Sequence, residues 1–207
     1  MWQKIKSIFK KSSILTRSSI DNFTKKEVES SENNKIDFSG ITANDVDMMM
    51  KYGKGSNKLG KWESKPFVEL SYGLVKKDLP ALMKQNDLEG TINAVMSSQF
   101  KDFKISKCQT TEVIGFILWI KEQMNFIDTI EAKFLYREPK PEMLAAGVHR
   151  LQEFGVLSTI DALAKGNILN YEKIEALPYY KVYEKLKLDT IHSDIEEKYN
   201  EIIKNKK

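Results

Sequence analysis

The sequence is poor in the residues that define several structural classes. Its 207 residues include one cysteine, five prolines and ten glycines. The single thiol, Cys108, cannot form a disulfide within the chain, so we expect it to stay reduced inside a cell or a virus particle. The scarcity of glycine and proline excludes collagen-like and low-complexity chains. What remains is an ordinary globular protein, whose length fits one domain with an appendage.

The sequence also lacks a long apolar run. Its densest apolar stretch, residues 113–120, ends at Lys121 and Glu122, whereas a membrane-spanning helix needs about 20 apolar residues. Lysines interrupt the apolar residues near the N-terminus, so this segment does not have the hydrophobic core of a secretory signal. We therefore expect no stable membrane insertion.

Arginine is scarce, and the charge balance is mild. The chain has 33 basic residues against 29 acidic ones, a formal net charge of +4. Only three of the basic residues are arginines, and arginine is the side chain preferred for bidentate recognition of phosphate or guanine. This composition is too mild for a dedicated nucleic-acid surface. It is compatible with non-specific proximity to DNA, because diffuse lysines attract phosphate without reading a sequence.

The first 36 residues differ from the rest and predict an extended basic arm. Residues 1–20 carry five positive charges and no negative one, and residues 12–34 are rich in serine, lysine and glutamate. Four apolar side chains fall on one face of a short helix and are expected to dock on a partner: Trp2, Ile5, Ile8 and Phe9. A groove on a protein, an anionic membrane surface and nucleic acid all suit such a segment.

Three consecutive methionines, Met48 to Met50, offer a second docking candidate. Consecutive helical residues point in different directions, so at most one or two of them face the core. We therefore expect either a plain core role or contact of Met49 and Met50 with a partner.

The body, residues 37–207, shows helical spacing of apolar residues almost throughout and predicts an all-α helical bundle. We expect helices at about residues 42–52, 67–75, 79–83, 88–96, 111–136, 141–154, 158–165, 171–177 and 178–188, and a charged C-terminal helix at about 190–207. A strand is an alternative at 100–107. The first half of the helix at 111–136 is apolar nearly all round, which indicates burial, and the expected core includes Trp119, Phe126 and Leu151.

Residues 55–61 match the G-x-x-x-x-G-K part of a phosphate-binding loop. The next residue should be serine or threonine to hold magnesium, but it is Trp62, and the preceding segment predicts a helix where such a loop follows a strand. We therefore interpret residues 53–61 as a flexible basic loop. Its lysines are candidates for contact with a phosphate backbone or an acidic partner: Lys54, Lys58 and Lys61.

No group of residues has the spacing of a metal or catalytic site. His149 and His192 are the only histidines, whereas zinc sites need at least three ligands, usually in closely spaced pairs. The carboxylates along residues 112–131 lack the Glu-x-x-His motif of a metal-binding bundle and predict a solvated stripe. A Cys–His pair stays open geometrically, although nothing around Cys108 indicates activation. We expect no enzymatic activity, no metal and no cofactor.

The C-terminal part of the chain resembles a known group of proteins. Residues 143–169, followed by Leu-Pro-Tyr-Tyr-Lys-Val-Tyr at 177–183 and a charged terminal helix, resemble small helical neck and tail-ring proteins of crAss-like tailed bacteriophages. The resemblance implies a non-enzymatic structural protein of the virion, made in the host cytoplasm. It implies a homo-oligomeric ring that acts as head-to-tail connector between portal and tail, contacts the portal and other tail-ring proteins, and lines the DNA channel. A phage tail-assembly chaperone and a peripheral membrane-binding helical protein remain the alternatives.

Overall fold

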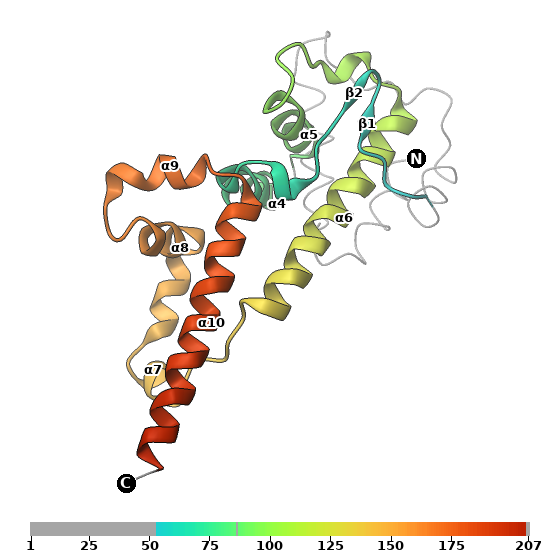
Figure 1. Cartoon of the computed structure of the whole chain (residues 1–207). Coiled ribbons are helices and arrows are strands. Elements are labelled where there is room, and N and C mark those ends of the chain that lie inside the picture. Colours follow the sequence, from blue (N-terminus) through green and yellow to red (C-terminus); the bar gives the residue numbers. More distant parts are fainter. Residues whose placement is uncertain (1–52, 86, 206–207) are drawn as a thin grey trace. The chain divides into compact units, whose positions relative to one another are not determined.

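The structure is a computed structural model, and it describes residues 53–85 and 87–205. Within this part of the chain every element except one small hairpin is a helix (Figure 1). The predicted all-α fold is therefore confirmed for these residues. The predicted arm (1–36) and the helix expected at 42–52 lie outside the described residues. So do six candidate docking residues: Trp2, Ile5, Ile8, Phe9, Met49 and Met50.

The described chain divides into two compact units. Unit 1 contains residues 53–67 and 74–124, and unit 2 contains residues 68–73 and 125–205. The short segment 68–73 therefore belongs to a unit that is otherwise built from the C-terminal part of the chain.

Unit 1 begins with a β-hairpin where the sequence predicts a flexible loop. Strand β1 (Lys58–Leu59) pairs antiparallel with β2 (Trp62–Glu63), and Leu59 lies opposite Trp62. Gly60 occupies the turn at φ +56°, a left-handed conformation that glycine adopts at little cost. The loop prediction is wrong because Leu59 and Trp62 are both buried and hold the hairpin against the rest of unit 1.

Short helices follow the hairpin. In chain order they are the 3-10 helix η1 (Phe67–Glu69), the π-helix η2 (Leu74–Asp78), α4 (Leu79–Gln85), α5 (Leu88–Ser97) and the 3-10 helix η3 (Ile105–Lys107). The helix predicted at 88–96 is confirmed, and Asp87 caps it by accepting a hydrogen bond from the Gly90 N–H at 2.8 Å. The strand alternative at 100–107 is wrong, since η3 lies there.

Helix α6 (Thr110–Phe134) is the long helix expected near residues 111–136. Its first half is buried as predicted, with Val113, Phe116 and Trp119 in the core of unit 1. The prediction that Phe126 belongs to a core is wrong, because this side chain is 51% exposed. Beyond residue 124 the helix belongs to unit 2, where Ile127 is the buried apolar residue of that turn.

Unit 2 contains segment 68–73, the end of α6, several short helices and one long one. In chain order the further helices are α7 (Pro141–Ala145), the 3-10 helix η4 (Val148–Phe154), α8 (Val156–Leu163), the 3-10 helix η5 (Ile168–Asn170), α9 (Tyr171–Glu175) and α10 (Tyr179–Lys204). The single helix predicted at 141–154 is wrong, because Gly147 at φ +88° interrupts it. The predicted break near residue 189 is also wrong, since α10 is continuous (Figure 1).

Candidate interaction surfaces

The segment that matches a phosphate-binding loop has a different conformation in unit 1. Gly60 and Lys61 form the turn of the hairpin, and a β-strand follows them where a phosphate-binding loop is followed by a helix. The first glycine, Gly55, is needed for packing: a Cβ atom there would lie 2.6 Å from the backbone N and Cα of Trp119 on α6. The glycines of this motif are therefore explained by the hairpin and its close approach to α6.

The hairpin is tied to α6 and to its own strands by hydrogen bonds. The Gly55 N–H donates to Oε1 of Glu122 at 3.1 Å, and the Ser56 N–H donates to the Gly115 carbonyl at 3.0 Å. The Asn57 side chain donates to the Ser64 carbonyl at 3.0 Å. These bonds make residues 55–64 an ordered part of unit 1.

Two of the three candidate phosphate-contacting lysines already contact carboxylates. Lys58 Nζ lies 3.5 Å from Glu63 Oε2, across the hairpin, and Lys61 Nζ lies 2.7 Å from Asp102 Oδ2. The hydrogen bond from Lys61, followed by one from the Trp62 indole, lowers the pKa of Asp102. Lys54 is exposed. Contact of these lysines with a phosphate backbone stays a prediction. Lys58 and Lys61 would have to break their ion pairs with Glu63 and Asp102 to make this contact.

The surroundings of Cys108 do not activate its thiol. Burial, followed by the charge of Glu112, raises the pKa of the Cys108 thiol, which is the opposite of what a nucleophilic thiolate needs. His149 and His192 are both exposed. Among residues 53–85 and 87–205, no group of three or more histidine, cysteine, aspartate and glutamate side chains could hold a metal ion.

Unit 2 contains a buried tyrosine cluster that the sequence analysis does not identify. The Tyr179 hydroxyl donates to Oε1 of Glu131 at 2.8 Å. The Tyr179 ring stacks between Tyr72 and Tyr183, with ring centroids 6.2 and 6.1 Å away. The spacing of the α6 carboxylates predicts a solvated stripe, and for Glu131 this prediction is wrong because its side chain accepts the Tyr179 hydrogen bond.

Burial is the main influence on the ionisation of these phenols. It raises the pKa of Tyr72 to about 12, with the negative charge of Glu131 as the next cause. The same two causes raise the pKa values of Tyr179 and Tyr183. All three phenols are therefore neutral at physiological pH, and the cluster acts as a hydrogen-bonded and stacked anchor for the start of α10.

The backbone of segment 68–73 completes this anchor. The Tyr72 N–H donates to the Leu177 carbonyl at 2.7 Å, and the Tyr179 N–H donates to the Leu70 carbonyl at 2.8 Å. Gly73 lies so close to α9 that an added Cβ would be 2.9 Å from the Glu175 Cβ. The first residues of α10 are thus fixed by both side chains and backbone.

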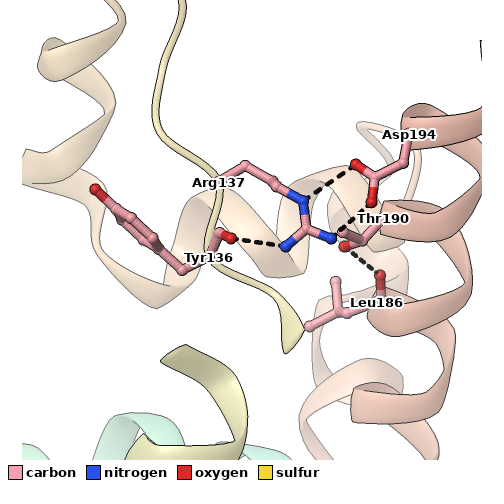
Figure 2. Close-up of polar contacts among 5 residues, drawn as sticks. All are labelled: Tyr136, Arg137, Leu186, Thr190 and Asp194. Atoms are coloured by element: carbon pink, nitrogen blue, oxygen red, sulfur yellow. Dashed lines mark hydrogen bonds and ion pairs between the residues drawn. The ribbon is translucent and has the colours of Figure 1, made fainter. Parts of the chain in front are cut away.

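The segment between α6 and α7 is tied to the middle of α10 by ion pairs. Figure 2 shows Arg137 facing Asp194 with two parallel hydrogen bonds, Nε to Oδ1 at 3.1 Å and Nη2 to Oδ2 at 2.7 Å. A third Arg137 nitrogen donates to the Tyr136 carbonyl at 2.8 Å. One turn further along α10, Lys140 Nζ lies 2.7 Å from Glu197 Oε1. These contacts hold one side of α10.

Unit 2 exposes a large set of apolar side chains. Its buried apolar residues are few, among them Ile127, Ile160, Tyr179 and Val182. Large apolar residues that are at least a third exposed are more numerous and occur on α6, α7, η4, α8, η5 and α10 and in the segments between helices: Phe126, Tyr136, Met143, Leu144, Leu151, Phe154, Leu157, Ile168, Leu169, Leu177, Tyr180, Leu188, Ile191, Ile195, Tyr199, Ile202 and Ile203. The core role predicted for Leu151 is wrong, because it is 54% exposed on the short helix η4.

Exposed apolar surface on this scale is typical of an interaction surface, because soluble monomers rarely expose large contiguous apolar patches. Part of this exposed apolar surface could have been found from the sequence, because isoleucines recur at helical spacing among lysines and glutamates in the charged C-terminal segment. This spacing alone does not tell whether the apolar face is buried or exposed.

No known protein family, curated protein or solved structure matches this chain. Across residues 53–85 and 87–205, no helix combines the length and apolar character needed to cross a membrane.

Proposed function

We propose that this protein is a non-enzymatic structural subunit that works as a homo-oligomer, a ring-forming connector of a phage neck or tail between portal and tail. The observation that supports the proposal is the apolar surface of unit 2, where exposed large apolar residues outnumber buried ones. Such residues are normally covered in the functional state, and neighbouring subunits of an assembly would cover them.

The chemistry of the described residues is compatible with a structural role. Its buried ionisable groups, such as Tyr72 and Tyr179, are engaged in packing and hydrogen bonds that hold α10. The motif at 55–61 is accounted for by the hairpin. The assignment to a phage neck rests on the resemblance of residues 143–183 to neck and tail-ring proteins, and the exposed residues Leu151, Phe154 and Leu157 lie inside that segment.

A closed ring requires a heterologous contact, in which one face of a subunit covers a different face of the next. Unit 2 offers apolar residues on several separate helices for such a contact. Leu151 and Phe154 are three residues apart on a 3-10 helix and therefore lie on the same side of it. Ile168 and Leu169, on η5, are the most exposed of the set, at 71% and 78%.

Electron microscopy of the full chain mixed with the cognate portal protein tests this proposal. We expect ring-shaped particles bound to the portal, and we expect the protein in purified virions. Absence of portal binding, together with absence of the protein from purified virions, would contradict the connector proposal. Transient portal or tail binding with absence from virions would identify the assembly chaperone instead.

A further inference from the structure

The C-terminal half of α10 carries an apolar stripe that its own unit does not cover. Residues 191–205 are all exposed. Five apolar side chains follow one another at spacings of three or four residues and are 44–62% exposed: Leu188, Ile191, Ile195, Tyr199 and Ile202. At 3.6 residues per turn, these five lie within about 80° of one another around the helix. A stripe this narrow is typical of a seam between two helices.

The stripe lies opposite the side of α10 that packs within unit 2. Tyr179 and Val182 are buried in the unit, while Asp194 and Glu197 pair with Arg137 and Lys140. Measured from the middle of the stripe, Tyr179, Val182 and Glu197 lie about 140–160° around the helix, and Asp194 lies about 100° around it. The ion pairs therefore involve a different side of α10 and leave the stripe exposed to solvent or to a partner.

The exposed face continues toward the start of α10. Tyr180, Lys181, Glu184 and Lys185 are all exposed and share the side of the helix that carries the stripe. The whole face, from Tyr180 to Ile202, is about 33 Å long at ~1.5 Å per residue. A partner helix of similar length can lie along it.

We propose that the partner is α10 of a second copy of this chain, packed antiparallel around a two-fold axis beside Ile191. In this register, residues equally far from Ile191 along the two helices lie beside each other. Tyr180 then meets Ile202 of the second copy, since both are 11 residues from Ile191. Leu188 meets Ile195 of the second copy within one residue of the same register. Apolar residues thus meet at the centre and at both ends of the contact, and charged residues such as Glu184 lie between them.

The charges beside the stripe select the antiparallel orientation. Glu184 and Lys198 are each seven residues from Ile191 and lie to the same side of the middle of the stripe, so each faces its opposite charge in the second copy. Lys185, which pairs with Asp189 of its own helix, and Glu196 are six and five residues from Ile191 and match within one residue on the other flank. All four are exposed. In a parallel in-register pair, Glu184 and Lys198 of different copies would be 14 residues, about 21 Å, apart along the helices, so this attraction would be lost.

This contact goes beyond the proposed ring. A two-fold contact is isologous and joins only two copies, so it does not close a larger ring. It describes the free protein before assembly, and the two ideas can fail independently. If the free protein is a monomer and binds the portal, only the dimer proposal is contradicted. If the free protein is a dimer and does not bind the portal, only the connector proposal is contradicted.

The test measures the dimer dissociation constant of the full chain, without portal, by sedimentation equilibrium. Ile195→Asp should weaken the dimer by at least about tenfold, because each dimer contains this residue twice. Ser193→Asp, which lies off the stripe on the same helix, is the matched control and should change it little. Circular dichroism checks that each variant keeps its helical content.

Charge exchange then tests the register. Glu184→Lys and Lys198→Glu should each weaken the dimer by about tenfold, since each creates two like-charged contacts. The double variant should return to within about threefold of the wild-type constant, because opposite charges face each other again. A wild-type protein that stays monomeric at its highest soluble concentration would overturn the proposal. So would a dimer that tolerates Ile195→Asp, or a double variant weaker than either single one.

Discussion

The Tyr179 hydroxyl donates a 2.8 Å hydrogen bond to Glu131, which joins the first turn of α10 to α6 within unit 2. The Tyr179 ring is among the most buried of the described residues, and Glu131 is half-buried. Because hydrogen bonds to charged groups contribute more than neutral ones, we expect this pair to be important for the stability of unit 2.

Replacing Tyr179 by phenylalanine removes the hydrogen bond but keeps the stacked ring. We expect the free energy of unfolding to fall by about 1.5–3 kcal/mol. Tyr180→Phe, at an exposed position one residue further on, is the control and should change it by less than about 0.5 kcal/mol. Urea unfolding followed by circular dichroism measures both. Equal effects of the two substitutions would show that the hydrogen bond is unimportant.

The tyrosine cluster also predicts a loss of stability at alkaline pH. The pKa of Tyr72 is raised from 10.0 to about 12 in the folded protein. A folded pKa above the unfolded one means that the neutral phenol stabilises the fold fully below pH 10 and that this contribution disappears as the pH approaches 12. Between these values the unfolding free energy should fall by about 1.4 kcal/mol per pH unit for this group.

Urea unfolding between pH 9 and pH 12 measures this slope. Tyr72→Phe removes the titrating group, so its stability should fall less steeply than that of the wild type over the same range. Parallel curves for the two proteins would contradict the assignment.

The glycines near α6 predict opposite effects of two similar substitutions. A Cβ at Gly55 would lie 2.6 Å from the Trp119 backbone, so Gly55→Ala should destabilise unit 1 by about 1–3 kcal/mol. At Gly115, inside α6, the nearest atom outside the helix backbone is 3.7 Å away. Gly115→Ala should therefore be neutral or stabilise by up to about 1 kcal/mol, because alanine favours helix. Thermal unfolding compares them, and a tolerated Gly55→Ala would rule out the close approach.

The Arg137–Asp194 pair predicts a local effect on α10. Arg137→Lys keeps the positive charge but loses the two parallel hydrogen bonds to the carboxylate. Since both side chains are about half exposed, we expect little change in overall stability and faster amide hydrogen exchange around residues 190–198. Mass spectrometry of exchanged peptides detects this, with the peptide of α5 as an internal reference. Unchanged exchange in α10 would mean that the pair does not hold the helix.

The helices were predictable from the sequence wherever apolar spacing and capping residues agreed. Residues 88–97 and the buried start of α6 follow from those signals. The hairpin was not predictable from local signals, because Leu59 and Trp62 are buried by residues distant in the sequence. Gly60 looked like part of a phosphate motif, although it serves a tight turn.

The surface of unit 2 shows a different limit of sequence reasoning. Phe126 and Leu151 have the spacing of core residues, yet both are about half exposed. Amphipathic spacing indicates that an apolar face becomes buried. It does not indicate whether residues of the same chain or residues of another copy bury that face. Ring contacts and the antiparallel α10 pair are both ways to bury it.

The measurement that tests the central claim most directly is the mass of the particles that the full chain forms in solution, read by native mass spectrometry over a range of concentrations. The account holds that the exposed apolar surface of unit 2 is covered by further copies of the chain. It therefore predicts discrete species at multiples of the mass of one copy, which increase with concentration and decrease in the Ile195→Asp variant. A single species with the mass of one copy at every concentration, with and without the portal protein, would contradict it.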